Sequence, residues 1–367
     1  MLSDFRFLDE AGPAKVVQIH EPAAGLKAFV VIDNVAAGPS IGGLRMGLEV
    51  SAEECFRLAR AMTFKNAVAG LPHGGGKSVL VGDPGMADAE KERLIRAFAC
   101  AARDLKDYIV GPDMGTNERC MAWVHDEIGR AVGLPAVLGG IPLDEIGATG
   151  FGLATAIDVA QEFCDVRLDG ARIAVQGFGA VGKHAARFLV EKDAILVAAS
   201  DSHGMVANAD GLDVQALIDH KAGGENLASF PGGSGERDAI LDVDCDIWIP
   251  AARPDVLTED NVGRLKARMV AQGANIPATP GAESALHQRG VLVLPDFAAN
   301  AGGVICASVE HHGGNCTLAM QSIEEKLTDN TRTVLQHARD AGTPPRQAAL
   351  EIAEARVREA MALRRWG

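Results

Sequence analysis

Three charged side chains stand in sequence settings that suit catalysis. Lys65 follows Leu58 and Met62 at helical spacing, which places a lysine on the helix stripe that should be buried. Lys77 ends a run of glycines that is typical of a turn with room for a ligand. Asp113 comes directly after a short apolar run and is flanked by glycines. A lysine on a buried stripe needs a chemical reason, so these three residues are candidate site residues.

Two lysines suit a substrate that carries a carboxylate and has a proton to lose. One lysine can pair with the carboxylate, and the other can act as a base near neutral pH because burial and a neighbouring ammonium disfavour its charged form. Simpler interpretations stay open: Lys65 can extend its ammonium to solvent, Lys77 can be an exposed loop residue, and Asp113 can be a turn-former. A phosphate loop is disfavoured, because Leu71 stands where the first glycine of that motif belongs.

A second motif indicates a dinucleotide. The stretch 177–182 has the G-x-G-x-x-G spacing between an expected strand at 171–175 and a helix expected from Lys183. Glycines there permit a tight turn and bring the backbone close to a pyrophosphate. The next strand ends on Asp201, whose carboxylate favours NAD, although Ser202 and His203 keep NADP as an alternative. The residues assigned to the cofactor from this motif are Gly177, Phe178, Gly179, Ala180, Val181, Gly182 and Asp201.

The elements that must position these residues follow from apolar spacing. Helices are predicted over about 51–69, 88–105 and 117–132, the first opening on a capping box at Ser51, with a short strand at 108–110. Beyond about residue 150, strands alternate with helices, which predicts an α/β fold with a parallel, doubly wound sheet. The glycine-rich segment 221–236 is expected to be a mobile surface loop. A chain of 367 residues with this change of pattern predicts two domains.

Composition excludes several classes of protein. With 47% hydrophobic and 23% charged residues the chain is globular rather than disordered, and its net charge of −14 argues against binding to nucleic acid or to an anionic membrane. The seven cysteines are scattered and form no CxxC pair, which indicates reduced thiols and no zinc site. The stretch 1–10 is not a basic segment leading into an apolar one, so we expect a cytoplasmic protein.

Nine blocks of sequence carry a resemblance to a known family. They are Gly38-Pro-Ser-Ile-Gly-Gly-Leu-Arg-Met, Met62-Thr-Phe-Lys-Asn-Ala, Leu71-Pro-His-Gly-Gly-Gly-Lys, Asp113-Met-Gly-Thr, Ala148-Thr-Gly-Phe-Gly, Gln176-Gly-Phe-Gly-Ala-Val-Gly, Cys245-Asp-Ile-Trp-Ile-Pro-Ala-Ala, Gly273-Ala-Asn-Ile-Pro-Ala-Thr-Pro and Pro295-Asp-Phe-Ala-Ala-Asn-Ala-Gly-Gly-Val. In this order, from about Asp33 to Val304, they resemble the glutamate/leucine/phenylalanine/valine dehydrogenase family.

The resemblance implies reversible oxidative deamination of an L-amino acid to a 2-oxo acid and ammonia. Lys65 would anchor the α-carboxylate together with the backbone of Gly42 and Gly43. Lys77 would be the catalytic lysine, which accepts the amine proton and later activates water. Asp113 would carry protons to and from the carbinolamine as ammonia leaves.

The resemblance also implies a division of labour along the chain. Residues 1–145 would form a substrate and oligomerisation domain, 146–325 a Rossmann-type dinucleotide domain, and 326–367 C-terminal helices that pack back on the first domain. The reaction would occur in the cleft between the domains, whose closure would expel water. The partners implied are small molecules and further copies of the chain in a homo-oligomer. Further cofactor-binding positions are Thr149, Asn275 and Asn300.

Two positions bear on the choice of amino acid. In glutamate-specific members a lysine and a serine hold the side-chain carboxylate, and the corresponding residues here are Ile41 and Ala307. A buried carboxylate without partners costs roughly a few kcal/mol, so we expect an apolar substrate such as leucine, valine or phenylalanine. Ser308 would restore a hydroxyl if the correspondence shifted by one residue, so glutamate stays an alternative.

Other activities remain as rivals. A hydroxy-acid or alcohol dehydrogenase would need a histidine base, for which His73 and His125 are the candidates, and a non-catalytic nicotinamide-binding protein would tolerate loss of the lysine. Adjacent His311 and His312 lack the spacing of metal ligands, so no metal is expected.

Overall fold

The computed structural model describes residues 7–365 as two compact units. Residues 1–6 and 366–367, which include part of the stretch considered as a leader and the ends of two expected domain ranges, lie outside the described residues. The first unit comprises the chain up to Pro142, Val304–Ala319 and the chain from Leu350 onward, and the second comprises Leu143–Gly303 and Met320–Ala349. The units therefore alternate along the C-terminal third of the chain.

This alternation differs from the continuous ranges 1–145, 146–325 and 326–367 expected from the sequence. Most of helix α11 (Cys316–Ala341) belongs to the second unit. Its Arg332 pairs with Glu162 at 2.7 Å, and its Arg339 lies 5.0 Å from the centre of the Phe163 ring. Side-chain contacts of this kind, rather than chain order, decide which unit a C-terminal helix joins.

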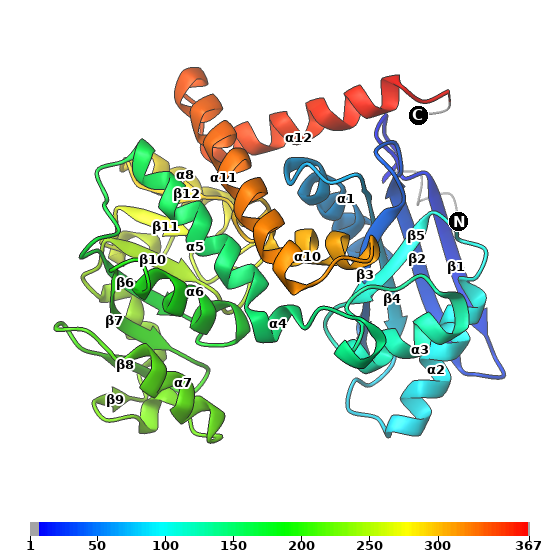
Figure 1. The fold of residues 1–367 in the computed structure, drawn as a ribbon, viewed down its shortest axis with the longest axis horizontal. Coiled ribbons are helices and arrows are strands. Elements are labelled where there is room, and N and C mark those ends of the chain that lie inside the picture. Colours follow the sequence, from blue (N-terminus) through cyan, green and yellow to red (C-terminus); the bar gives the residue numbers. More distant parts are fainter. Residues whose placement is uncertain (1–6, 366–367) are drawn as a thin grey trace. The chain divides into compact units, whose positions relative to one another are not determined.

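The first unit is built on a five-stranded mixed sheet. Its strands are β1 (Lys15–Glu21), β2 (Leu26–Asn34), β3 (Ser40–Gly47), β4 (Gly74–Val81) and β5 (Tyr108–Pro112), in the order β1-β2-β4-β3-β5. The pairs β1–β2 and β2–β4 are antiparallel, and β4–β3 and β3–β5 are parallel (Figure 1). Parallel β4, β3 and β5 therefore lie side by side, and they carry the candidate catalytic residues.

Helices cover both faces of this sheet. Val31 of β2 packs with Phe56 of α1 (Ala52–Val68), whereas the adjacent Val30 belongs to the cluster that contains Phe98 of α2 (Asp88–Ala101). Helix α3 (Glu118–Ile128) joins the second cluster through Met121. Successive residues of a strand point to opposite faces, so the middle of β2, at Val30, Val31 and Ile32, is continuously apolar because both of its faces are buried there.

The glycine run before Lys77 forms a strand, β4, and not the turn that the sequence suggested. Glycine is a poor strand former, but larger residues do not fit at these positions. A Cβ on Gly74 would overlap the carbonyl of Asn34, and a Cβ on Gly75 would overlap the backbone nitrogen of Thr63. The glycines let α1 lie directly on β4, and the strand holds Lys77 in a rigid frame.

Helix α1 starts as expected but is rotated relative to the predicted stripe. The Ser51 hydroxyl accepts a hydrogen bond from the Glu54 backbone N–H at 3.1 Å, as an N-cap does. The fully buried positions include Cys55, Ala59 and Thr63, whereas Leu58, Met62 and Lys65 are only half-buried. The expectation that Lys65 is buried was therefore wrong, because packing on β2 and β4 selects a neighbouring stripe.

The second unit confirms the predicted α/β fold. Its sheet has the order β12-β11-β10-β6-β7-β8-β9, with parallel pairing from β12 to β7 and antiparallel pairing of β8 and β9. The segment 221–236, expected to be a loop, contains the end of α7 and strand β9, which pairs with β8. The strands are β6 (Arg172–Gln176), β7 (Ile195–Ser200), β8 (Met205–Ala207), β9 (Gly233–Ser234), β10 (Ile247–Pro250), β11 (Met269–Ala271) and β12 (Leu292–Leu294).

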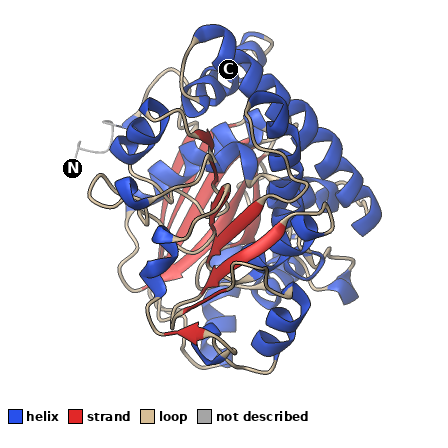
Figure 2. Ribbon diagram, turned by 90° about the vertical axis from the view of Figure 1, so that its left-hand side faces the viewer, coloured by secondary structure: helices blue, strands red, loops and turns tan. Residues whose placement is uncertain are grey.

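Helices flank the strands of this unit as well (Figure 2). The remaining α-helices are α4 (Leu143–Ile146), α5 (Ala148–Ala160), α6 (Ala180–Val190), α7 (Val214–Ala222), α8 (Pro280–Gln288), α9 (Asp296–Ala299), α10 (Gly302–His311) and α12 (Pro345–Ala362). Short 3₁₀ helices are η2 (Ala136–Leu138), η3 (Gln161–Phe163), η4 (Leu227–Ser229), η5 (Arg237–Asp242) and η6 (Val262–Arg264). Within residues 7–365, none of the helices has both the length and the apolar character that a membrane crossing requires.

The contact between α1 and β4 generates a stability prediction. Gly75→Ala should lower the free energy of unfolding by roughly 3 kcal/mol, because the new methyl group forces helix and strand apart. The matched control is Gly85→Ala, at an exposed glycine of the same unit where the nearest atom to a Cβ is 3.4 Å away. Thermal unfolding of both variants measures the difference, and equal midpoints would contradict the packing argument.

Candidate active site

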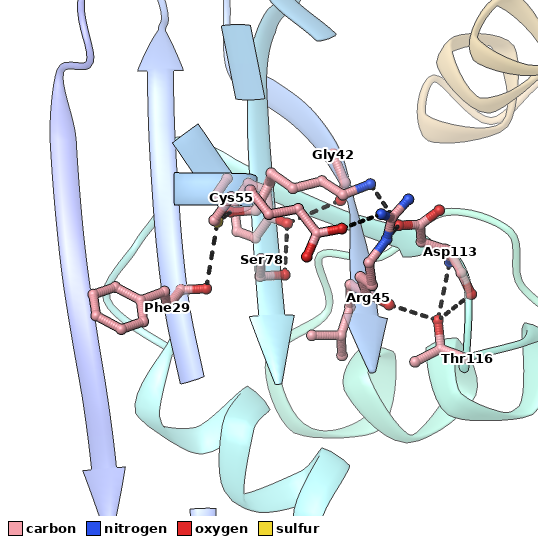
Figure 3. A network of polar contacts seen from close by, with 11 residues as sticks. Phe29, Gly42, Arg45, Cys55, Ser78, Asp113 and Thr116 are labelled. Carbon is pink, nitrogen blue, oxygen red and sulfur yellow. Dashed lines mark hydrogen bonds and ion pairs between the residues drawn. The ribbon is translucent and has the colours of Figure 1, made fainter. Parts of the chain in front are cut away.

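Lys77 and Asp113 form an ion pair in the first unit. Lys77 lies in the middle of β4, and Asp113 follows the last residue of β5. The Lys77 Nζ and Asp113 Oδ2 atoms are 2.6 Å apart, and Asp113 is labelled in Figure 3. The two side chains are 7% and 20% exposed. The structure thus brings together the two residues that the sequence proposed for proton transfer, although they are far apart in the chain.

Asp113 stays ionised despite its burial. Burial raises the pKa of this carboxyl group, but the charges and hydrogen bonds of Lys77 and Arg45 outweigh burial, so its pKa falls below the ordinary value of 3.8. At neutral pH the residue is a carboxylate that can hold a proton donor in place.

Gly42 and Gly43 lie in β3 beside this pair. Strands β3 and β4 pair Ile41 with Gly75 and Leu44 with Ser78. Gly42 and Gly43, which lie between these two pairs, have no paired residue on β4. A Cβ on Gly43 would lie 2.7 Å from the Asp113 Cβ and 3.3 Å from Lys77 Nζ. Only glycine leaves space against the ion pair at this position.

A buried tyrosine holds the peptide group between the two glycines. The Tyr108 hydroxyl donates to the Gly42 carbonyl at 2.9 Å, so it accepts its second hydrogen bond, of 2.8 Å, from the Ser78 hydroxyl (Figure 3). Burial raises the pKa of Tyr108, which keeps the phenol neutral and able to donate. Because a peptide group is planar, fixing the carbonyl of Gly42 also fixes the N–H of Gly43.

Lys65 is placed near the end of α1, which packs on β4. The carbonyls of Ala67 and Val68, just beyond it, accept hydrogen bonds of 2.9 and 2.7 Å from Arg356 of α12. This arginine adds hydrogen bonds to the last carbonyls of the helix, so it holds the end of α1 that carries Lys65.

Ile41 and Ala307 meet in one apolar cluster with Ile109 and Val132. The neighbouring Ser308 is engaged elsewhere, in a hydrogen bond of 3.1 Å with His73 Nε2.

His73, proposed as a base under the rival mechanisms, is a buried structural residue. Its Nδ1 lies 3.1 Å from the carbonyl of Pro39, which can only accept, so Nδ1 carries the proton and Nε2 accepts from Ser308. Burial, together with the nearby His311 and His312, lowers the pKa of His73 to about 4. The Ser308 hydroxyl is thus fixed by a neutral histidine.

The sequence analysis missed Arg45 and Glu54. Arg45 Nε lies 2.9 Å from the same Asp113 oxygen that binds Lys77, and its NH1 lies 2.5 Å from Glu54 Oε1. The signal was present, since Arg45 stands two residues after Gly43 on a strand and therefore points to the same face. Strand β3 had not been predicted, so this periodicity could not be used.

The turn from β6 into α6 fits a dinucleotide. Gly177 has φ +94°, a conformation that other residues rarely adopt, and no atom lies within 4 Å of the Cβ position of Gly179. Gly182 packs against the carbonyl of Gly177, where a Cβ would overlap it. Phe178 is buried, and α6 begins at Ala180, three residues earlier than expected, so that Val181 lies in its first turn. The open backbone at a helix N-terminus is the environment that a pyrophosphate requires.

Asp201 follows β7 as expected, but its carboxylate is already engaged. It accepts hydrogen bonds from Lys221 Nζ at 2.7 Å, from the His203 N–H at 2.9 Å and from the Leu227 N–H at 3.0 Å. Its side chain is 9% exposed. A ribose would therefore have to share or displace these contacts.

The other cofactor candidates lie in the same unit. Thr149 is half-buried in the first turn of α5. The Asn300 side chain donates to Asn275 Oδ1 at 3.0 Å and to the Gly273 carbonyl at 3.1 Å. Asn275 is exposed, and the buried Asn300 fixes the position of its side-chain oxygen.

Residues 7–365 contain no group of three or more histidine, cysteine or acidic residues arranged to hold an ion. His312 instead contacts the Ser308 carbonyl through Nδ1 at 2.7 Å.

Comparison with known proteins agrees with this geometry. Residues 139–365 match the model of the Glutamate/Leucine/Phenylalanine/Valine dehydrogenase family, and residues 13–130 match the model of the Glu/Leu/Phe/Val dehydrogenase dimerisation domain. The chain is 38% identical to a glutamate dehydrogenase of Aeropyrum pernix and 34% identical to an NAD-specific glutamate dehydrogenase of Staphylococcus aureus. Each match covers 91% of this chain and 85% of the relative.

Solved structures show the same likeness. A hetero-hexameric glutamate dehydrogenase from Thermus thermophilus, in a leucine-bound form, matches with a TM-score of 0.84 at 27% identity over 96% of this chain and 90% of that one. The L-tryptophan dehydrogenase of Nostoc punctiforme matches with a TM-score of 0.76 at 26% identity over 98% of each chain.

The doubly wound sheet and the matches to dehydrogenases together identify the class of the protein, a nicotinamide-dependent oxidoreductase. The chain belongs to the glutamate/leucine/phenylalanine/valine dehydrogenase family, and it is an amino-acid dehydrogenase.

The Tyr108 hydrogen bond generates a kinetic prediction. Tyr108→Phe frees the peptide between Gly42 and Gly43, so the KM of the amino acid should rise about tenfold while kcat changes within about twofold. Ser78→Ala, which keeps the bond from Tyr108 to Gly42, should have a smaller effect. Steady-state kinetics measure both, and an unchanged KM in a folded Tyr108→Phe enzyme would show that this peptide does not bind substrate.

Proposed function

We propose that the protein is an NAD-dependent dehydrogenase of an apolar L-amino acid of the leucine, valine or phenylalanine kind. The amino acid, oxidised cofactor and water would give the 2-oxo acid, ammonium, reduced cofactor and a proton, and the reaction is reversible. The observation that carries the proposal is the buried Lys77–Asp113 pair beside Gly43. When bound, the nicotinamide supplies a hydride acceptor for the hydrogen on the substrate Cα.

Each residue of the first unit has a separate task in this proposal. Lys65 and the Gly42–Gly43 backbone hold the α-carboxylate, which fixes the Cα. Lys77 accepts a proton from the substrate ammonium, because only a neutral amine can support loss of hydride from its carbon. After that proton has passed on to Asp113, the neutral Lys77 takes a proton from the water that attacks the imine carbon.

Asp113 connects this chemistry to solvent. It contacts Lys77 directly and is more exposed, 20% against 7%. A carboxylate in this position can pass the proton from the buried lysine outward and can return one to the leaving nitrogen of the carbinolamine. Placing this step on Asp113 leaves Lys77 in the interior, where it meets the substrate.

The apolar substrate is supported by the cluster of Ile41, Ile109, Val132 and Ala307. None of these side chains offers a hydrogen bond to a carboxylate. Ser308, which could have supplied a hydroxyl, is buried and bound to His73. Charged glutamate would leave its carboxylate without partners at this cluster, which costs about 1–3 kcal/mol or more. A carboxylate-binding role therefore does not suit these residues, even though the relatives named above include glutamate dehydrogenases.

NAD is proposed over NADP because the acidic Asp201 lies at the end of β7. Its ion pair with Lys221 places a cation at the same position. The preference between NAD and NADP therefore depends on how Asp201 and Lys221 divide the contacts to the ribose. A homo-oligomer is proposed as well: a dimerisation-domain model matches residues 13–130, and the similar Thermus thermophilus enzyme, a hetero-hexamer, supports assembly into an oligomer.

The activity itself is the first test. Reduced-nicotinamide absorbance, followed with NAD and NADP separately over a panel of L-amino acids, should show turnover of apolar substrates with NAD. Lys77→Ala should lower kcat by roughly 10²–10⁴-fold. The matched control is Lys27→Ala, an exposed lysine on β2 that should keep full activity. Full activity in Lys77→Ala, or no turnover with any amino acid, would overturn the proposal.

The substrate choice has its own test. Placing a lysine at Ile41 and a serine at Ala307, in the double variant I41K/A307S, should raise kcat/KM for glutamate by about 10²-fold and lower it for leucine, because the side-chain carboxylate gains partners. Ser308→Ala serves as the control, since its hydroxyl faces His73, and it should not change the ranking of substrates. If glutamate is already the best substrate of the wild-type enzyme, the apolar assignment is wrong.

A further inference from the structure

We propose that Arg346 is a positioning residue for the nicotinamide half of the cofactor, because it fixes both ends of the short segment 272–276 that carries Asn275. This inference rests on the proposed function, in which Asn275 contacts the cofactor. Arg346 lies in the first turn of α12, and it belongs to the second unit together with the segment that it holds.

The order of strands in the second sheet indicates which half of the cofactor Asn275 meets. Dinucleotides bind at the carboxyl ends of parallel strands, across the point where the strand order reverses. Within the order β11-β10-β6-β7, the Gly177 turn follows β6, Asp201 follows β7 on one side, and Asn275 follows β11 on the other. The two halves of a dinucleotide extend in opposite directions from the pyrophosphate, so Asn275 lies on the nicotinamide side. The segment is also close to the glycine turn, since a Cβ on Gly273 would lie 3.1 Å from Val181 in the first turn of α6.

The segment that carries Asn275 ends in a strained residue. Ile276 has a φ of +50°, in the left-handed region that a β-branched residue rarely adopts. Its side chain does not pack into the core, because the residue is 48% exposed. Backbone contacts hold it instead: the Ile276 N–H donates to Asp296 Oδ2 at 2.7 Å, and its carbonyl accepts from the Asp255 N–H at 2.9 Å.

Arg346 holds Asp296 and the start of the segment at the same time. Its NH2 group donates to Asp296 Oδ1 at 2.7 Å and to Gln272 Oε1 at 2.8 Å. The same Gln272 oxygen accepts the backbone N–H of Asp296 at 3.0 Å. Gln272 is the first residue of segment 272–276, and Asp296 binds its last residue, Ile276. One guanidinium therefore fixes both ends of the segment.

Glu283 orients this guanidinium from α8. Its carboxylate accepts hydrogen bonds from Arg346 Nε at 2.6 Å and from Arg346 NH2 at 2.8 Å. The side chains of Glu283 and Asp296 are only 13% and 6% exposed, so the two carboxylates need a cation between them. The planar fork of an arginine can reach both carboxylates and the Gln272 amide, whereas a lysine offers a single point of charge.

Loss of the guanidinium should release the strained residue. Without Arg346, the carboxylates of Glu283 and Asp296 repel each other, Asp296 turns toward water, and Ile276 loses its acceptor. The segment then relaxes to other backbone conformations. If roughly a tenth of the molecules keep Asn275 in place, the apparent Kd of the nicotinamide cofactor rises about tenfold. The glycine turn that holds the pyrophosphate is not part of this network, so a ligand without nicotinamide should bind as before.

The test compares the binding of NADH with that of ADP-ribose, which lacks the nicotinamide, by titration calorimetry on the full-length enzyme without amino acid. Arg346→Met should raise the Kd of NADH about tenfold and leave that of ADP-ribose within about twofold. Arg346→Lys keeps the charge but not the fork, and it should raise the Kd of NADH by about threefold. Arg332→Met is the matched control, because it removes an exposed arginine–carboxylate pair of the same unit, and it should change neither Kd.

A second substitution tests whether the strain at Ile276 carries the effect. Asparagine adopts the left-handed region more readily than isoleucine, so the turn depends less on the network in an I276N enzyme. In that background Arg346→Met should raise the Kd of NADH by less than about threefold. General damage to the fold would instead cause the same rise in both backgrounds.

The possible outcomes separate the two proposals. If the wild-type enzyme binds neither NADH nor NADPH, the proposed function fails; if it prefers NADPH, the comparison is made with NADPH and 2′-phospho-ADP-ribose. If the wild-type enzyme binds its cofactor but Arg346→Met leaves the Kd within about twofold, weakens the ligand without nicotinamide equally, or acts equally in both Ile276 backgrounds, the role of Arg346 is overturned. If Arg346→Met does not fold, Glu283→Gln decides the question, since it keeps the shape of the side chain and should raise the Kd of the cofactor alone by about threefold.

Discussion

A buried lysine needs a carboxylate, and the first unit is arranged around this requirement. Lys77 is 7% exposed in the middle of a strand, where an isolated ammonium would be very unfavourable. Asp113, just after the end of β5 and two strands away in the sheet, supplies the carboxylate that pairs with Lys77. The parallel pairing of β4, β3 and β5 sets the separation of the two residues, and Arg45 and Glu54 surround them. The pairing of the three strands therefore brings the carboxylate of Asp113 to the buried ammonium of Lys77.

The glycine content of the chain follows from this arrangement. Of its 42 glycines, five in β3 and β4 stand where helix α1, the neighbouring strands and the ion pair approach the backbone too closely for a side chain: Gly42, Gly43, Gly74, Gly75 and Gly76. Glycine weakens a strand, so such a sheet needs support elsewhere. Strand β2 supplies it, because its two faces are buried against different helices. The catalytic strands can be rich in glycine because their neighbour is rich in branched apolar residues.

The second unit contains a network of ion pairs around a half-buried arginine. Arg346, in the first turn of α12, pairs with Glu283 at 2.6 Å and with Asp296 at 2.7 Å. Asp296 also accepts the backbone N–H of Ile276 at 2.7 Å, and Ile276 has a positive φ of 50°, which is unfavourable for a β-branched residue. The network holds this strained turn, and the turn carries Asn275. A C-terminal helix thereby stabilises the loop that carries Asn275, which we propose to bind the cofactor.

The sequence by itself determined the class of the protein. Three features show it: the glycine turn before α6, the alternation of strands and helices, and the family blocks. All three depend on local spacing, so they can be recognised without knowing any tertiary contact. The positions of Lys77 and Asp113 as candidates came from the same blocks. Tertiary structure alone decided that the glycines before Lys77 form a strand, that Lys65 lies beside the buried stripe, and that Glu54 turns from its helix cap to Arg45. It also decided that Asp201 binds Lys221 and that segment 221–236 adds a strand to the sheet. Each of these depends on contacts between residues distant in the chain, where packing and charge outweigh the local propensity that a sequence displays.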